Sequence, residues 1–251
     1  MQTPSYQVAA ALFLLLVAFL AFLSLRGFRA ALRAAGSSLE RSRRGVGLAA
    51  ALLLAWLAYV GVVAQSGILR DFTALPPRLL LVLLPPFAFA AALCLLPAVG
   101  RLLDTAPSAA LVYVQSFRVL MEIILWLLFR AGVVPVQMTF EGRNWDILVG
   151  LTAPVVAYMC FTRRAWSPGV AMLWNLGGLA LLLNIVIVSA LSTPAPFRVF
   201  MEGPANTMVA DLPFVWLPSF VVPVALCSHL LSLRQLLRAG RRPVAPAMQL
   251  A

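Results

Sequence analysis

The strongest constraint on this chain is the recurrence of apolar stretches about as long as a bilayer is thick. A helix needs about 20 predominantly apolar residues to cross the hydrocarbon core. Seven stretches reach or approach that length, at residues 8–25, 46–65, 79–99, 108–131, 145–162, 170–191 and 212–233. Of all residues, 63% are hydrophobic and 11% are charged, against about half and a quarter in soluble domains. We predict an all-α integral membrane protein, a single polytopic domain over residues 1–251 with a bundle of about seven transmembrane helices.

The arginines predict the orientation of the bundle, because cytoplasmic loops carry the excess of positive charge. All 19 basic residues are arginine. With the N-terminus outside, the cytoplasmic segments hold Arg26, Arg29, Arg33, Arg41, Arg43, Arg44, Arg101, Arg163, Arg164, Arg234, Arg238, Arg241 and Arg242. The outer segments hold only Arg70, Arg78, Arg130, Arg143 and Arg198. The first apolar stretch lacks a preceding positive charge and is followed by arginines, the reverse of a cleavable signal. We therefore expect the N-terminus outside and the C-terminus in the cytoplasm.

The segment 26–45 is the most basic part of the chain. Arg26, Arg29 and Arg33 share one face if the first helix continues beyond the membrane. Such a surface favours anionic lipid headgroups at the cytoplasmic face, and a membrane-protein partner or a second copy of the chain is the alternative. The net charge of +11 is spread over loops between apolar stretches, so we expect no nucleic-acid partner.

The fourth stretch, Ser108 to Ala131, carries two ionisable residues near its middle, Arg118 and Glu122. Charges at that depth cost about 2.5–3.5 kcal/mol each and persist where they face the protein interior. Gln115, Arg118 and Glu122 share one helical face, and Arg118 and Glu122 are expected to pair because they are four residues apart. The pair either fixes helix packing or forms a site for a ligand, an ion or a proton.

Two outer segments, 132–145 and 192–212, have the composition of structured loops. The first alternates apolar and other residues before a turn signal, which predicts a short hairpin or a re-entrant segment. Together with the start of the next stretch, these segments contain Glu141, Arg143, Asn144, Asp146, Glu202 and Asn206. They form either a lid with local ion pairs or a polar vestibule above the face of Arg118 and Glu122.

Cofactors and metals are not expected. Cys94, Cys160 and Cys227 lie in apolar stretches, and Cys227 points away from the single histidine, His229, if both lie on one helix. The absence of lysine excludes a retinal Schiff base, and one histidine excludes bis-histidine haem ligation within the chain. No catalytic motif is present, which makes an enzyme the least favoured class. Gly177 and Asn184 share a face of the sixth stretch, as is typical of close helix packing.

Two functional hypotheses remain. Prolines interrupt the third and seventh stretches, so that backbone carbonyls there need other partners. Together with the polar fourth stretch and the outer loops, this favours a transporter or solute-binding protein for a small polar or anionic solute. Arg118 would hold an anionic group, and Glu122 would bind a cation or a proton. The alternative is a non-catalytic subunit of a membrane complex. The lysine-free composition, rich in Ala, Leu and Arg, suggests the inner membrane of a GC-rich bacterium.

Overall fold

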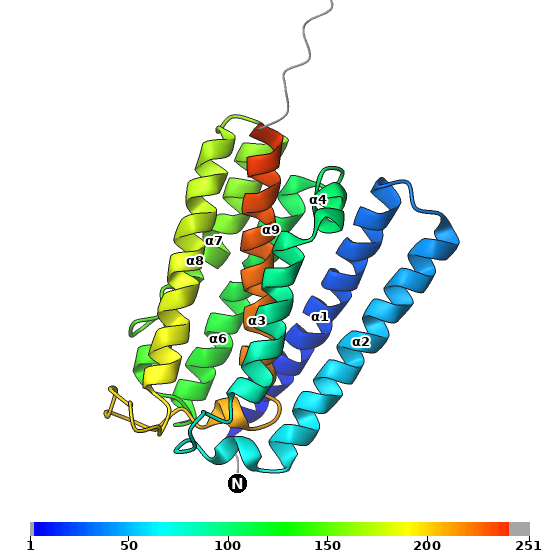
Figure 1. The fold of residues 1–251 in the computed structure, drawn as a ribbon. Coiled ribbons are helices and arrows are strands. Elements are labelled where there is room, and N and C mark those ends of the chain that lie inside the picture. The colour runs from blue at the N-terminus through cyan, green and yellow to red at the C-terminus, as the bar shows by residue number, and fades with distance from the viewer. Residues whose placement is uncertain (1–2, 241–251) are drawn as a thin grey trace, which may run out of the picture.

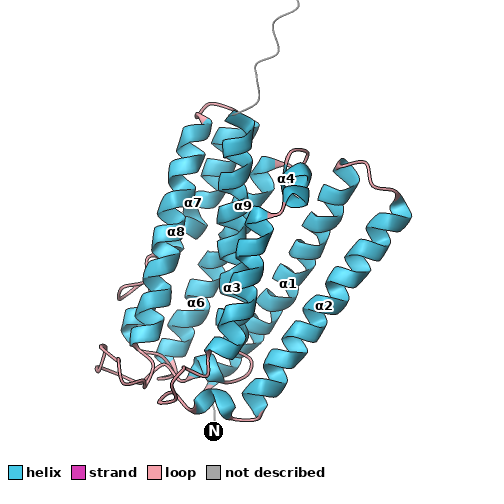
Figure 2. Cartoon of the chain, in the orientation of Figure 1, coloured by secondary structure: helices cyan, strands magenta, loops and turns pink. Residues whose placement is uncertain are grey.

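The computed structural model describes residues 3–240, and every regular element in this range is helical (Figure 2). Arg241 and Arg242, two of the predicted cytoplasmic arginines, lie outside the described residues. The α-helices are α1 (Pro4–Ala34), α2 (Leu39–Gln65), α3 (Leu80–Leu95), α4 (Pro97–Leu103), α5 (Ser108–Tyr113), α6 (Phe117–Arg130), α7 (Asp146–Ala157), α8 (Pro168–Leu191) and α9 (Val222–Gly240). A 3₁₀ turn joins α5 to α6, and π-helical turns extend α7 to Thr162 and begin the α9 run at Leu217.

Each of the seven apolar stretches coincides with helix, but fewer of them qualify as membrane spans. Within residues 3–240, five helical runs are long and apolar enough to cross a membrane: α1, α2, Ser108–Arg130, α8 and Leu217–Gly240. The pair α3 and α4 adds a sixth if it is one span, although its two parts are bent by 70°. The stretch 145–162 forms only a shorter apolar helix, Asp146–Thr162. The fold therefore has five to six candidate spans, compatible with a multi-pass membrane protein.

The helices run side by side and alternate in direction (Figure 1). The loops that follow α2, α6 and α8 gather at the end of the bundle where the N-terminus lies, and α9 ends at the opposite end. α1 and α2 form a hairpin along one side, in which α1 packs against both α2 and α6. α9 contacts α3, α5 and α8. This arrangement places α6 and α9 at the centre, where buried polar groups can find partners.

The apolar core forms between α1 and α6. Phe13, Leu16 and Leu20 of α1 are buried together with Ile124 and Leu128 of α6. By contrast, the outer face of α2 exposes large apolar side chains, as does much of α8. In a bilayer, such a face stabilises the bundle through van der Waals packing, because lipid tails are as apolar as the side chains that pack there. Exposed apolar faces of this length are those expected of helices that contact lipid.

The basic segment 26–45 is mostly helical. α1 continues to Ala34, so that Arg26, Arg29 and Arg33 lie on a continuous helix and are exposed, as expected. Gly36 then takes a φ of +80°, a left-handed conformation that favours glycine, and ends the helix. Ser38 begins α2, and its hydroxyl accepts a hydrogen bond from the Arg41 N–H at 3.3 Å.

The break between α3 and α4 is held by α9. Pro97 has no N–H and cannot donate to the carbonyl of Leu93 four residues earlier. Arg234 of α9 replaces that donor: its Nη1 donates to Leu93 O and its Nη2 to Leu96 O, both at 2.9 Å. Gly100 allows this approach, because a Cβ there would lie 2.9 Å from Arg234 Nη2. The carbonyl freed by the proline, Leu93 O, is thus bonded by a neighbouring helix.

The prediction of a hairpin in residues 132–145 is wrong. This segment contains turns and the 3₁₀ helix Val136–Met138, without a strand. The turn closes when Arg143 N–H donates to Gln137 O at 3.1 Å and Asn144 N–H to Thr139 O at 3.2 Å. At Gly142 a Cβ would overlap the backbone of Val136 and Gln137, so that close backbone packing replaces strand pairing. The segment presents Asn144 to the bundle interior, and the buried Asp146 follows at the start of α7.

Candidate functional site

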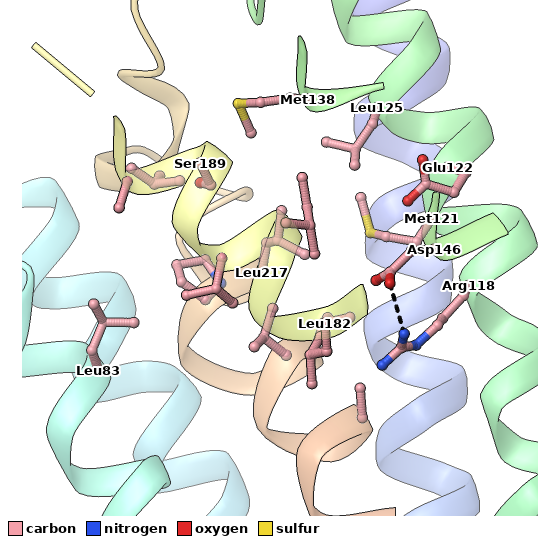
Figure 3. Close-up of a pocket in the computed structure, with 18 of the residues that line it drawn as sticks. Leu83, Arg118, Met121, Glu122, Leu125, Met138, Asp146, Leu182, Ser189 and Leu217 are labelled. Carbon is pink, nitrogen blue, oxygen red and sulfur yellow. Dashed lines mark hydrogen bonds and ion pairs between the residues drawn. The ribbon is translucent and has the colours of Figure 1, made fainter. Parts of the chain in front are cut away.

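A cavity of about 150 Å³ lies between α3, α6, α8 and the start of the α9 run (Figure 3). Most of its walls are apolar and come from all four elements, with Leu83 on α3, Leu125 on α6, Leu182 on α8 and Leu217 at the start of the α9 run. The charged residues that line it are Arg118, Glu122 and Asp146. Figure 3 shows these three together on one side and Leu83 across from them. The cavity thus combines an apolar body with one polar wall.

Arg118 pairs with Asp146 and not with Glu122, which corrects the expected pairing. Its Nη1 lies 2.9 Å from Asp146 Oδ1, and both side chains are buried. The same Nη1 also donates to the carbonyl of Gly178 in α8, at 3.5 Å. Asp146 reaches Arg118 because it begins α7, and α7 approaches α6 closely at Gly150, where a Cβ would lie 2.7 Å from Val119 N. The ion pair therefore joins α6 to α7.

Glu122 is 2% exposed and bonds to a neutral partner. Its Oε1 accepts a hydrogen bond from Asn144 Nδ2. Asn144 is itself fixed, because its Nδ2 also donates to Met138 O at 3.2 Å and its Oδ1 accepts from the Asp146 N–H at 3.2 Å. Among residues 3–240, no arginine forms an ion pair with Glu122. The turn of residues 132–145 thus positions the Glu122 carboxylate without supplying a counter-charge.

Three buried polar atoms of the charged cluster have no partner within the described chain. They are Glu122 Oε2, Arg118 Nε and Arg118 Nη2. An unpaired buried polar atom costs about 1–3 kcal/mol, and more when the group is charged. The cavity beside the cluster has room for a group that would satisfy at least some of these atoms. The arrangement can therefore bind a small molecule that carries a polar head.

The other sequence-predicted residues separate into two groups. Asn144 contacts Glu122 directly, and Asn206 donates from Nδ2 to the hydroxyl of Ser189, a residue lining the cavity, at 2.8 Å. Gln115 is buried but donates to Ala225 O of α9 at 3.0 Å. It braces two helices and does not line the cavity.

The remaining loop charges make local contacts. Glu141 accepts a hydrogen bond from Trp126 Nε1 at 2.8 Å. Arg143 lies over the ring of Phe200, with 5.3 Å from its guanidinium carbon to the ring centroid. Glu202 is exposed. None of these three lines the cavity. These loops therefore resemble a packed lid more than a charged vestibule.

A second polar cluster, which the sequence analysis did not identify, adjoins the site at Gly178. His229 of α9 is fully buried, and its Nδ1 lies 2.9 Å from Asn175 Oδ1 of α8. Asn175 Nδ2 donates to Ser232 Oγ at 3.0 Å. Gly178 allows the close approach, because a Cβ there would lie 2.6 Å from His229 Nε2. In the sequence, the only indication of this contact is the pair of adjacent glycines Gly177 and Gly178. The sequence analysis considered Gly177, whereas His229 packs against Gly178.

Metal ligation has no support in the part of the chain that the structure describes. No group of three or more His, Cys, Asp or Glu side chains lies together there. Cys94, Cys160 and Cys227 are free thiols.

Residues 75–237 match the model of a protein family described as Domain of unknown function (DUF8737). All the residues that line the cavity fall within this range. The hairpin of α1 and α2 precedes it. No curated protein and no solved structure matches the chain.

Proposed function

We propose that this chain, which belongs to the family described as Domain of unknown function (DUF8737), is a membrane protein that binds or transports a small solute. The site is the cavity beside Arg118, Glu122 and Asp146. One observation carries the proposal: Glu122 and Arg118 line a cavity large enough for a small molecule, and both have buried side-chain atoms without a partner among the described residues. Ionisable groups within the membrane are costly to place, and they usually mark functional sites.

The proposal includes a topology of seven spans with the N-terminus outside. α3 and α4 together form one broken span, and Asp146–Thr162 forms a short one. The arginine distribution supports this orientation through the positive-inside rule. The loops after α2, α6 and α8 then form the outer face, and the arginines near the α1–α2 turn contact anionic lipids on the cytoplasmic side. The composition favours a bacterial inner membrane.

A second candidate function is that of a structural subunit in a membrane complex. The observation in its favour is that the Arg118–Asp146 pair joins α6 to α7 beside the close contact at Gly150. Such a pair can fix helix register without binding anything. The exposed apolar face of α2 would then contact a partner or a second copy.

Thermal unfolding in detergent separates the two functions. The proteins compared are wild type, Glu122→Gln, Arg118→Met and the double variant Arg118→Met/Asp146→Leu, each with a panel of small solutes. A solute at 100 times its Kd stabilises the folded state by about 2.7 kcal/mol, which raises Tm by roughly 5–10 °C for a chain of this size. We expect one solute class to stabilise wild type and Glu122→Gln to lose that response.

Glu40→Gln is the matched control, because Glu40 is an exposed residue of α2 that pairs with Arg44 far from the cavity. The structural function predicts a different pattern. Arg118→Met alone would lose about 3–5 kcal/mol because Asp146 is left unpaired, and the double variant would recover. That pattern, without stabilisation of wild type by any solute, would refute the binding proposal.

A further inference from the structure

We infer that the site takes a small organic cation, a primary amine with a compact apolar body, whose charged head binds Glu122. This inference rests on the proposed function and names its solute class. It differs from the expectation from sequence, in which Arg118 holds an anionic group. The charges, the cavity size and the nature of its walls carry it.

The formal charges of the residues that line the cavity do not sum to zero. The charged residues comprise one cation, Arg118, and two carboxylates, Glu122 and Asp146. Asp146 already neutralises Arg118 through their 2.9 Å contact. Within the described residues, Glu122 has a neutral amide on one carboxylate oxygen and no partner on the other. A buried carboxylate without a counter-charge is strongly unfavourable and is neutralised either by a proton or by a bound cation; we take a cation as the occupant of this site.

The arginines on the outer loops next to the site are held elsewhere. Arg143 lies over the ring of Phe200. Arg198 donates from Nε to Phe200 O at 2.8 Å and from Nη2 to Gly203 O at 3.2 Å. Arg130 lies over Trp126, at 5.4 Å from the ring centroid. None of them pairs with Glu122, so a cation that pairs with it would have to come from outside the described residues.

The cavity walls favour an organic cation over a metal ion. Ca²⁺ takes about 6–8 oxygen ligands and Mg²⁺ about six, whereas this cavity is lined mostly by carbon, including Leu182, Leu217 and Val221. Phe87 and Phe117 also line it, and aromatic rings attract ammonium groups. A dry cavity of about 150 Å³ holds a body of the size of benzene. Benzylamine therefore has an ammonium group that can pair with Glu122 and a ring of a size that the cavity can hold.

The test compares three molecules with the same ring and different heads: benzylamine, benzyl alcohol and benzoate. Binding to the purified full chain is measured at neutral pH by isothermal titration calorimetry. We expect benzylamine to bind at least about tenfold tighter than the other two, because loss of one partner of a buried charge pair costs a factor of ten or more. Glu122→Gln should abolish this preference, and Glu40→Gln should preserve it.

A second variant tests the apolar half of the site without altering a charge. Ile185 of α8 lines the cavity, and Ile185→Phe would fill part of it. We expect weaker binding of benzylamine and unchanged binding of methylamine, because methylamine has the same ammonium group but no ring to place in the cavity. This pattern also supports the inference if Glu122→Gln does not fold.

The outcomes distinguish this inference from the function on which it rests. Tighter binding of benzoate that Arg118→Met abolishes would overturn the amine and leave a solute site intact. Stabilisation by Na⁺ or by acidification alone, with no preference for benzylamine, would also overturn it. If neither these compounds nor any member of the solute panel bound, both the inference and the proposed function would fail.

Discussion

Gly178 is the residue at which the charged cluster and the histidine cluster meet. Its carbonyl accepts from Arg118 Nη1, and His229 packs against its Cα. We predict that Gly178→Ala lowers the free energy of unfolding by about 1–3 kcal/mol, the usual effect of overpacking, because the new Cβ would lie 2.6 Å from His229 Nε2. Thermal unfolding in detergent measures the change.

Gly177 provides the control on the same helix. A Cβ there would meet nothing within 4 Å, so Gly177→Ala should stabilise α8 by about 0.5–1 kcal/mol, the helix advantage of alanine. Equal effects of the two substitutions would contradict the proposed contact between α8 and α9.

At this scale the sequence identifies buried charges more readily than their partners. Arg118 and Glu122 stand out because ionisable residues are rare in apolar stretches. The rule for pairs four residues apart describes an isolated helix, and here Asp146 approaches from α7 instead. That contact depends on how α6 and α7 pack at Gly150, which the local pattern does not contain. For the same reason, the sequence does not predict the contact between Asn175 and His229.

At the scale of the element, the broken helix α3–α4 depends on one arginine. Arg234 donates to Leu93 O and Leu96 O. We predict that Arg234→Leu lowers the free energy of unfolding by about 1 kcal/mol, since Leu93 O, which is partly buried, would be left without a donor. Arg101→Leu on α4 is the control, because Arg101 is exposed. Thermal unfolding compares the two, and an Arg234 variant as stable as the control would contradict the role given to Arg234.

The prolines were identified as helix breaks from the sequence, and the structure shows their different outcomes. Pro85 and Pro86 lie inside α3, which continues past them. Only Pro97 coincides with a sharp bend. At the bend, the freed carbonyl is bonded by Arg234, which is distant in sequence. Proline thus predicts where a helix is weakened, and tertiary contacts decide whether it bends.

At the scale of the whole molecule, the positions of helices are easier to predict from the sequence than the number of membrane spans. Helix depends on local apolar patterning, and all seven stretches are helical. Spanning depends on length and straightness, and the bend after α3 and the shortness of Asp146–Thr162 reduce the candidates to five or six. The hairpin of α1 and α2 lies outside the family match, yet Phe13 packs against Phe214 at 5.1 Å between ring centroids. It is part of the same core.

The parity of the spans provides the last prediction. Counting the broken α3–α4 pair and the short α7 run as crossings gives seven spans, so that N- and C-termini lie on opposite sides. If either one does not cross, the termini share a side. The arginine excess predicts a cytoplasmic C-terminus. A green fluorescent protein fused after Ala251 should therefore fluoresce in bacterial cells, and alkaline phosphatase at the same place should be inactive.

A phosphatase inserted after Glu202, in the loop between α8 and the α9 run, should be active because that loop lies on the outer face in the proposed topology. Active phosphatase at the C-terminus together with an active insertion would mean that the last run does not cross. Inactive phosphatase at Glu202 with a fluorescent C-terminus would place the loop in the cytoplasm and contradict the proposed orientation of this end of the bundle. Under the proposed function, the orientation decides which end of the bundle faces the outside, and so from which side a solute would enter.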